Sequence, residues 1–475
     1  MRTRKSTTRS GPSTRQPAQR PRSTSPTRSP SSKKSKPTPQ PKRARKRQRA
    51  AEHSRTKARR QRQAARRARG QQAAKLCQQR AERRHELNGK GLQAHAVGVL
   101  QKNLKLRDHS KRCSAALLFT VLLAAAGHCT SIAAACYRLE NGPSEQTIYN
   151  ALQATLPDYT ELERRINRAL RAHLPARLRR RRQRLAIDLT LIPYHGQPQH
   201  DPKEIYRGQA KCGTSHFHAY ASLYLVCQGQ RFTVALTRVE LGEAMKVVVQ
   251  RLLHWGKRAG IRPKLLLLDR GFYSVAVISY LKRARVPFLM PAVARGRKPA
   301  DGTASGIRAF QLRKRGGWGE HTLSSGKQRT KVQIAVCCGN YRGQWKRHGR
   351  YAWVYAYWGF RPGSLRWVAD TYRTRFGIET SYRQMNQGRI KTCTRSPLLR
   401  YLYVAIALVL RNVWVWLHWE VLSTPRRGGR RLNLQRLTFE GLLVFLVHAA
   451  EALFGFRDRF IAERPPPATL TAGTG

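Results

Sequence analysis

Acidic residues are scarce in this sequence: its 475 residues contain 24 Asp and Glu against 93 Lys and Arg, for a formal net charge of +69. A protein surface whose charged residues serve only to contact water normally carries both positive and negative side chains. The imbalance therefore predicts a polyanionic partner, because Lys and Arg gain affinity by releasing counterions from phosphates. Nucleic acid is the first candidate and an anionic membrane the second. The charge says nothing about the fold.

The sequence also lacks the short motifs of several enzyme classes. It has no glycine-rich phosphate loop, no Gly-x-Ser-x-Gly and no His-Glu-x-x-His, so P-loop, serine-hydrolase and zincin chemistry have no support. Its nine cysteines include no Cys-x-x-Cys pair, and we expect a reducing compartment without a disulfide framework. No apolar stretch follows the first basic residues, so we expect no secretory signal and a cytoplasmic, nucleoid-associated protein.

Long hydrophobic runs are few. Residues 113–129 are Ala-rich and short, and Arg411, Asn412 and His418 interrupt the run 401–419. A membrane span needs about 20 apolar residues with few or no charges. We expect both runs to be buried core helices and expect no membrane partner.

Composition divides the chain into five segments. The first is rich in Arg, Lys, Ser, Pro and Gln and has almost nothing to bury, which is typical of disorder. Its Arg-rich half is a candidate to become helical on a polyanion. The expected organisation is a disordered basic arm at 1–88, a helical domain at 89–183, an α/β core at 184–292 and 361–455, a β-rich insertion at 293–360, and a disordered tail at 456–475.

Two short helices are predicted around a turn at 140–143. Small apolar residues fill 131–139, and Ser144 then caps a second helix whose apolar positions share one face. Helix, glycine-containing turn and helix form the helix-turn-helix pattern, in which Gln146 and Asn150 would point toward base edges. Two small helices that only pack against each other give the same pattern.

Residues 184–292 change to strand patterns in the order β-β-β-α-β-α-β. Three meandering strands followed by β-α units predict an α/β fold, with a mixed sheet flanked by helices. Two further strand signals, at 331–338 and 351–358, define the β-rich insertion, and helices follow it.

Three carboxylates stand out against this background. Asp188 lies inside the apolar strand LAIDLTLI, Asp269 ends the run LLLLD, and Glu379 lies on a helix. A buried strand carboxylate is costly unless it is paired or binds a metal, and carboxyl ends of strands are where sheets place active sites. Each acid alone also has an ordinary explanation: a bulge, a turn or a solvated helix face. Their combination predicts a site for Mg²⁺ or Mn²⁺ that cleaves phosphodiesters.

The segments AIDLT, LLLLDRGFYS and YRTRFGIETSYRQMNQGRIKT resemble the DDE transposases of insertion sequences, over roughly residues 184–420. The family signature around the glutamate is Tyr, two residues, Arg, three residues, Glu, six residues, Lys. Tyr372, Arg375 and Glu379 match it, but Asn386 stands where the family has Lys. Arg383, Arg389 and Lys391 are the candidates to replace that lysine.

The resemblance implies an RNase H-like core and a cut-and-paste reaction. Asp188, Asp269 and Glu379 would bind Mg²⁺ or Mn²⁺; water would cut at the transposon end, and the freed 3′-OH would attack target DNA. Tyr372 and Arg375 would contact phosphate near the cleaved end. The resemblance also implies double-stranded DNA as partner, a homodimer on DNA, and base stacking on an insertion tryptophan, Trp318 or Trp345.

Two other functions stay open at this point. One is a transposase-derived protein that binds DNA without cutting it, which the substitution at 386 allows. The other is an RNA-binding protein, because an Arg-rich arm does not distinguish DNA from RNA. Further DNA contacts are expected from Arg383 and Lys391, and from Lys211 in a loop with Lys203 and Arg207. A solvated loop explains these last three equally well.

Overall fold

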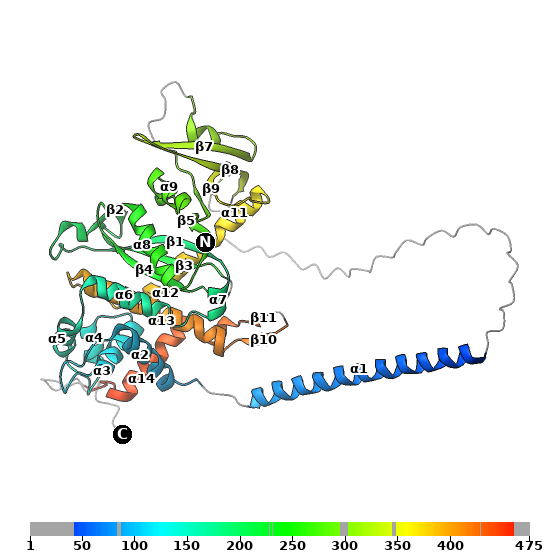
Figure 1. Cartoon of the computed structure of the whole chain (residues 1–475). Coiled ribbons are helices and arrows are strands. Elements are labelled where there is room, and N and C mark those ends of the chain that lie inside the picture. Colours follow the sequence, from blue (N-terminus) through cyan, green and yellow to red (C-terminus); the bar gives the residue numbers. More distant parts are fainter. Residues whose placement is uncertain are drawn as a thin grey trace, which may run out of the picture. The chain divides into compact units, whose positions relative to one another are not determined.

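The structure is a computed structural model, and it describes residues 42–82, 87–227, 229, 231–294, 303–343, 348–427 and 429–459. Its contacts divide the chain into two compact units, residues 1–86 and 87–475. Each unit is considered by itself (Figure 1). The predicted boundary near residue 183 does not separate units, so the finer division into domains stays a prediction.

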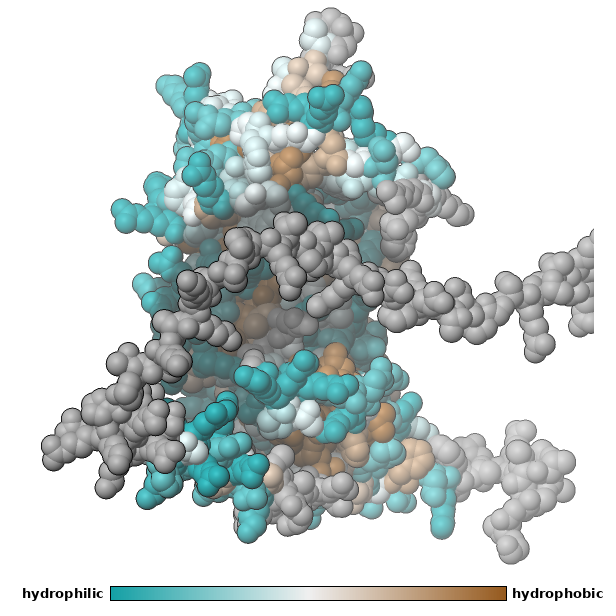
Figure 2. Space-filling view, turned by 90° about the vertical axis from the view of Figure 1, so that its right-hand side faces the viewer, coloured by the Kyte–Doolittle hydropathy of each residue, from teal (hydrophilic) through white to brown (hydrophobic). Residues whose placement is uncertain are grey.

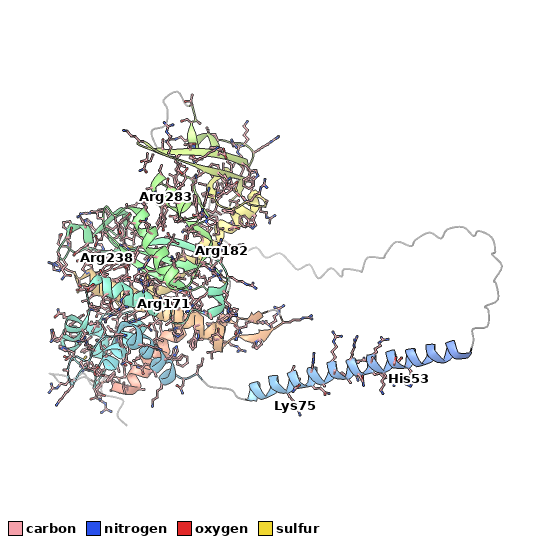
Figure 3. All side chains as sticks on the ribbon, in the orientation of Figure 1. His53, Lys75, Arg171, Arg182, Arg238 and Arg283 are labelled. Atoms are coloured by element: carbon pink, nitrogen blue, oxygen red, sulfur yellow. The ribbon has the colours of Figure 1, made fainter. Side chains whose placement is uncertain are left out.

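The first unit contains one long helix, α1 (Lys42–Glu82). This differs from the disorder expected for the arm, of which residues 1–41 lie outside the described residues. Ala, Arg, Gln and Lys are strong helix formers and fill this stretch, which explains why it is helical without a core. Residues 56–75 are all exposed, and Figure 3 shows side chains along α1, with His53 and Lys75 labelled. No apolar stripe runs along α1, so it offers charge rather than a packing surface.

The second unit begins with helices, as predicted. Their bounds are α2 (Gly89–Leu104), α3 (Ala115–Gly127), α4 (Ile132–Arg138), α5 (Glu145–Thr155), α6 (Tyr159–Leu170) and α7 (Ala176–Arg180). The predicted cap is present: the Ser144 side chain accepts a hydrogen bond from the Thr147 N–H at the start of α5. Gln146 and Asn150 are exposed on α5, and the Gln146 Nε2 donates to Asn150 Oδ1 at 2.7 Å.

A mixed sheet follows the helices, and its nine strands are counted over the described residues. The bounds of the core elements are β1 (Gln183–Pro193), β2 (Tyr206–Lys211), β3 (Thr214–Leu225), β4 (Thr233–Val239), α8 (Met245–Arg258), β5 (Pro263–Leu268), α9 (Val275–Arg283) and β6 (Phe288–Pro291). The strand order is β2-β3-β1-β5-β6-β9-β8-β7, and β4 also pairs with β3. β1 is antiparallel to β3 and parallel to β5. The α/β class, with a mixed sheet flanked by helices, is confirmed, and β2 is an edge strand where a loop was expected.

The insertion continues the core sheet. It holds α10 (Gly306–Gln311), β7 (Gly317–Ser325), β8 (Gln328–Arg342) and β9 (His348–Trp358). β9 pairs antiparallel with β6, and β8 and β7 follow outward. Two of these strands match the predicted signals, and β7 was not predicted. Trp318 is 45% exposed on β7, whereas Trp345 lies outside the described residues.

The C-terminal elements close the unit. They are α11 (Leu365–Arg373), a 3-10 turn (Thr374–Phe376), α12 (Gly377–Gln387), α13 (Pro397–Trp416), a π-helical turn (Leu417–Val421), the hairpin β10 (Thr424–Arg426) and β11 (Gly429–Arg431), a 3-10 turn (Leu434–Arg436) and α14 (Phe439–Phe454). α14 packs against α2 and α3. The helical segment before the sheet and the last helix therefore share one core.

Three helical segments are apolar enough to compare with membrane spans. Pro397–Val421 and Leu434–Phe454 are long and apolar enough to cross a membrane. The bent pair of α3 and α4 is also long and apolar enough if it is counted as one span. Inside the protein, however, 89% of the first window and 44% of the second are buried. Nearly all of α3 is buried as well. The face drawn in Figure 2 is mostly hydrophilic, with separate small hydrophobic patches.

Candidate active site

Asp188 lies in the middle of β1, between two hydrogen-bonded neighbours. It pairs with Ser222 of β3 on one side, and the residue before it pairs with Leu268 at the end of β5 on the other. Its side chain is only 13% exposed. Its Oδ1 accepts a hydrogen bond from the Leu189 N–H at 2.9 Å. One carboxylate oxygen is thus held by the backbone, and the other is left to face the site.

Asp269 and Glu379 come from two other elements. Asp269 follows β5 directly, at the carboxyl end of the strand, and makes no side-chain hydrogen bond to the 3-10 turn that it opens. The ordinary explanation of a turn-capping aspartate is therefore not what the structure shows. Glu379 lies in the first turn of α12. Their side chains are 38% and 46% exposed, so both reach solvent where Asp188 does not.

One guanidinium, that of Arg375, joins the three acids. Its Nη1 donates to Asp188 Oδ2 at 2.9 Å. Its Nη2 lies 3.6 Å from Asp269 Oδ1 and 3.5 Å from Glu379 Oε1. Residues 188, 269 and 379 are far apart in the sequence. The fold brings all three carboxylates within 3.6 Å of one guanidinium.

The buried position of Asp188 changes its acidity. Burial raises the pKa of this carboxyl from 3.8 to about 6, although the charge of Arg375 acts in the opposite direction. The neighbouring charges of Asp269 and Glu379 also raise its pKa. A buried carboxylate next to two others is stable in its ionised form only when positive charge is close. The site therefore favours a cation among its three acids.

Tyr382, which the sequence analysis did not single out, supports this arrangement. Its hydroxyl donates to the backbone carbonyl of Asp188 at 2.9 Å and lies 2.8 Å from Ser222 Oγ. It joins α12 to β1 and β3 in a fully buried place. The only sequence signal for it is its position three residues after Glu379, which places both residues on neighbouring faces of α12.

The predicted phosphate contacts divide into two groups. Arg375 and Tyr372 are buried, 5% and 6% exposed, and the Arg375 guanidinium lies over the Tyr372 ring, 5.5 Å from its centroid. In this structure the three carboxylates hold Arg375, and its predicted contact with DNA phosphate stays a prediction. Arg383, Lys391, Lys211, Gln146 and Asn150 are exposed instead, and among the described residues no contact joins these five to the carboxylates.

Asn386 lies exposed near the end of α12. Its Oδ1 is 3.5 Å from the Nε of Arg389, and its backbone carbonyl accepts a hydrogen bond from the Cys129 thiol at 3.2 Å. Arg389 is half-buried, whereas Lys391 and Arg383 are exposed. The exposed side chains are therefore the better placed of the three candidates to replace the family lysine.

The donor set suits a hard divalent cation. Carboxylate oxygens are the ligands that Mg²⁺ and Mn²⁺ prefer, and three of them lie around one point here. Within the described part of the chain, no three His, Cys, Asp or Glu side chains form a cluster tight enough to hold an ion. The Arg375 guanidinium contacts all three acids in this structure. A metal ion would supply the positive charge that Arg375 now provides.

Comparison with known proteins agrees with this site. The family model described as "Transposase DDE domain" matches residues 179–413. No curated protein matches the chain. Among solved structures, a piggyBac transposase synaptic complex with hairpin DNA is similar at 10% identity, covering 76% of this chain and 80% of that chain, with a TM-score of 0.46. The family match spans all three carboxylates and the arginine between them, so the chain carries a transposase DDE domain over residues 179–413.

Proposed function

We propose that this protein is a DNA transposase that cuts phosphodiester bonds at the ends of a transposon and joins the freed strands to target DNA. The convergence of Asp188, Asp269 and Glu379 on one point, inside a transposase DDE domain, is the observation that carries the proposal. These acids come from three elements that are separate in the sequence. Acids that were only solvated surface charges would have no reason to lie so close together.

The reaction has two displacements at phosphorus. In the first, a water oxygen forms a bond to the phosphorus, the bond to the 3′ oxygen breaks, and that oxygen leaves as a 3′-OH with a proton from the water. In the second, this 3′-OH attacks a target phosphodiester, a new P–O bond forms, and the target's own 3′ oxygen leaves protonated. Neither step needs an oxidant or reductant.

Asp188, Asp269 and Glu379 would hold Mg²⁺ or Mn²⁺. When bound, the metal supplies Lewis-acid stabilisation of the attacking and leaving oxygens. The chain itself fixes the ligands. Strand pairing and the Tyr382 hydroxyl hold the backbone of Asp188, and Arg375 keeps the three acids together by charge. The proposed phosphate contacts are Tyr372 and Arg375 at the site, with the exposed cations Arg383 and Lys391.

Double-stranded DNA is the proposed partner, bound mainly through its phosphates. The net charge of +69 supports this. The α4–α5 pair would read base edges through Gln146 and Asn150. A transposon has two ends that react together, so a homodimer on DNA is proposed. The proposed location is the cytoplasm, at the nucleoid.

The decisive experiment measures cutting of a duplex that carries the terminal inverted repeat of the element. Wild-type protein is compared with Asp188→Asn, Asp269→Asn and Glu379→Gln in Mg²⁺ and in Mn²⁺. Asp370→Asn is the matched control, because Asp370 is an exposed acid on the neighbouring helix α11, paired with Arg366 at 3.7 Å. Binding of the same duplex is measured in parallel.

We expect metal-dependent cutting at the repeat end by wild type and by the control variant. Each carboxylate variant should lose cutting by at least about 100-fold, because removing one key electrostatic group costs this much, while DNA binding survives. Tight binding without cutting by wild type would favour the non-catalytic, transposase-derived protein. Preference for structured RNA over the duplex would favour the RNA-binding alternative.

A further inference from the structure

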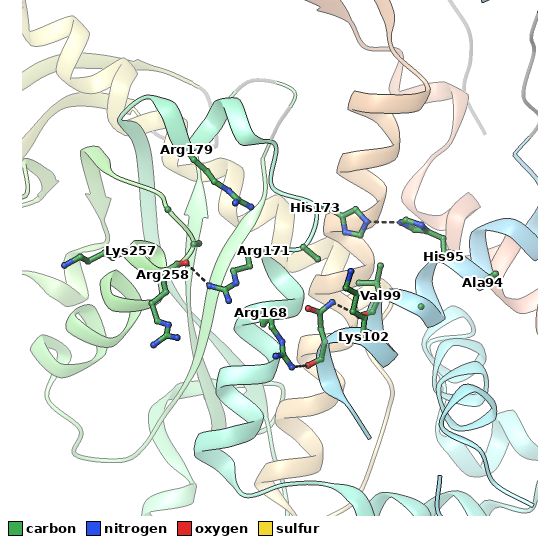
Figure 4. A pocket seen from close by; sticks show the side chains of 15 residues that line it. Ala94, His95, Val99, Lys102, Arg168, Arg171, His173, Arg179, Lys257 and Arg258 are labelled. Carbon is green, nitrogen blue, oxygen red and sulfur yellow. Dashed lines mark hydrogen bonds between the residues drawn. The ribbon is translucent and has the colours of Figure 1, made fainter. Parts of the chain in front are cut away.

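A wide pocket of about 890 Å³ opens at the helical side of the second unit, away from the carboxylates. α2, α6 with the residues after it, and the end of α8 form its walls (Figure 4). No acidic residue lines it. The cations that line it are Lys102, Arg168, Arg171, Arg179, Lys257 and Arg258.

None of these six side chains forms an ion pair among the described residues. Arg168 donates to the Asn103 carbonyl at 2.6 Å, and Arg171 donates to the Arg258 carbonyl at 2.7 Å. A guanidinium carries five N–H donors, so each keeps most of its hydrogen-bonding capacity. The Nε of Arg168 is buried and has no partner in the protein. Lys102, Lys257 and Arg258 are exposed around the opening.

A simpler explanation covers part of this cluster. α2, α6 and α8 all end here, and cations near helix C-termini stabilise the helix dipole. The hydrogen bonds from Arg168 and Arg171 to carbonyls at the ends of α2 and α8 are of this kind. Arg179 donates similarly to the Leu174 carbonyl just after α6, at 3.4 Å. Three such bonds do not account for six cations around one cavity. Burial lowers the pKa of Arg171, and the neighbouring charges of Arg258, Arg168 and Arg179 lower it further. The cations therefore repel one another, and an anion in the pocket would relieve that repulsion.

The other residues that line the pocket are uncharged, and several of them are small. The Nε2 atoms of His95 and His173 lie 2.8 Å apart, and His95 stacks on Trp416 with ring centroids 4.7 Å apart. Burial lowers the pKa of His173 to about 4, so this pair is neutral at pH 7. Most of the other lining positions are glycine or alanine, among them Gly98 and Gly260. The pocket therefore presents positive charge around an open centre.

The pocket and the three acids lie at opposite ends of β5. Gly260 of the pocket precedes this strand, and Asp269 follows it. Nine residues of extended chain span up to about 30 Å, at roughly 3.3 Å per residue. A phosphate in the pocket is therefore not the phosphate that reacts.

We propose that this pocket, lined by Lys102, Arg168, Arg171, Arg179, Lys257 and Arg258, binds phosphate groups of the DNA backbone at a second place, outside the catalytic site. That the ligand is DNA rests on the proposed function. The chemistry recognised is that of closely spaced phosphates, which a free polyphosphate shares. A backbone bound here would fix the position of the duplex some distance from the bond that is cut.

The test uses the full chain with Lys102→Gln, Lys257→Gln and Arg258→Gln combined. These three side chains are exposed, so their replacement leaves the buried core intact. A second triple variant, Lys314→Gln, Lys327→Gln and Arg329→Gln, removes the same charge from exposed positions around β7 and serves as the matched control. Binding to a generic duplex is measured between about 50 and 200 mM salt, the range over which phosphate contacts change affinity most visibly. Stabilisation against heat by inorganic tripolyphosphate is measured for all three proteins.

If each of the three cations contacts a phosphate, the salt dependence of DNA binding should flatten by up to about 2.7 in log–log slope, at roughly 0.9 per contact. Affinity at low salt should fall at least about tenfold, whereas the control triple changes the slope less. Tripolyphosphate should stabilise wild type and should stabilise the pocket variant less.

Equal slopes for the two triple variants would overturn the proposal. A pocket variant that loses tripolyphosphate stabilisation but keeps its full DNA salt slope would also overturn it, because the pocket would then hold a free polyphosphate and not DNA. Failure of the proposed function gives a different result, in which wild type does not bind the duplex or does not cut the repeat end.

Discussion

The two ends of β5 carry opposite charge. At the carboxyl end, three acids surround one cation, Arg375. At the amino end, six cations line a pocket without an acid. The protein has 24 acids in 475 residues, and it gathers three of them where a metal-dependent reaction would need them. The scarce acids thus gather where the proposed reaction takes place, and the abundant cations gather where a polyanion is proposed to bind.

Removing the one cation of the acidic end is expected to have the largest effect. Arg375→Met would leave Asp188 buried beside two further carboxylates, and breaking a buried ion pair from one side costs roughly 3 kcal/mol or more. We expect the free energy of unfolding in urea at pH 7 to fall by about this amount. The double variant Arg375→Met with Asp188→Asn should recover part of the loss. A single variant as stable as wild type would show that the three acids do not depend on Arg375.

Replacing the buried acid Asp188 should change the free energy of unfolding by a similar amount and in the opposite direction. The folded pKa of Asp188, about 6, exceeds its ordinary value of 3.8. Its ionisation therefore opposes folding. This penalty is absent below pH 3.8, grows as pH rises, and is complete above pH 6, where two pKa units correspond to about 3 kcal/mol. Asp188→Asn should be more stable than wild type at pH 7.5, with the difference shrinking toward pH 4. A variant that is less stable at pH 7.5 would contradict the unfavourable ionisation.

Removing the Tyr382 hydroxyl measures how much its hydrogen bonds stabilise the part of the fold that holds Asp188. Tyr382→Phe removes the donor to the Asp188 carbonyl and the contact with Ser222. A buried hydrogen bond of this kind contributes about 1 kcal/mol, so unfolding should become easier by that amount. Ser222→Ala and the double variant complete a mutant cycle. A coupling energy near zero between the two positions would mean that the hydroxyls do not act as a unit.

The smallest effect is expected at Asn386, where the family has lysine. Asn386→Lys adds one exposed cation near the end of α12, on the helix that carries Glu379. One added phosphate contact would steepen the log–log salt slope of binding to the transposon end by about 0.9. Asn386→Gln, which adds length without charge, should leave the slope unchanged. Equal slopes for both variants would place residue 386 away from the DNA.

The sequence predicted two of the three acids because each stands in an unusual context. Asp188 interrupts an apolar strand, and Asp269 ends one. The periodicity of residues 184–292 also predicted the order of the core elements, which the structure shows with β2 added. The family signature then connected Glu379 to them. Their common neighbourhood follows from the sheet order, in which β1 and β5 are adjacent.

Other features depended on long-range contacts that a sequence does not display. Arg375 was expected to face DNA, and only the fold shows that three carboxylates surround it. β2 and β7 are short or polar strands, and pairing with β3 and β8 rather than an apolar pattern defines them. The basic pocket draws its residues from several separate stretches, each of which resembles ordinary surface charge.

The last helix has a consequence for how the protein is made. α3 is apolar on every side, and α14 covers it so closely that a side chain added at Gly127 would lie 2.6 Å from Val447. More than 300 residues separate the two helices in the chain. At 5–20 residues per second, a ribosome needs roughly 15 to 60 seconds to reach α14 after it has made α3. During that time α2 and α4 can pack against α3, but the face that α14 covers has no partner in the chain, so the core of the first helices is completed only when synthesis is almost finished.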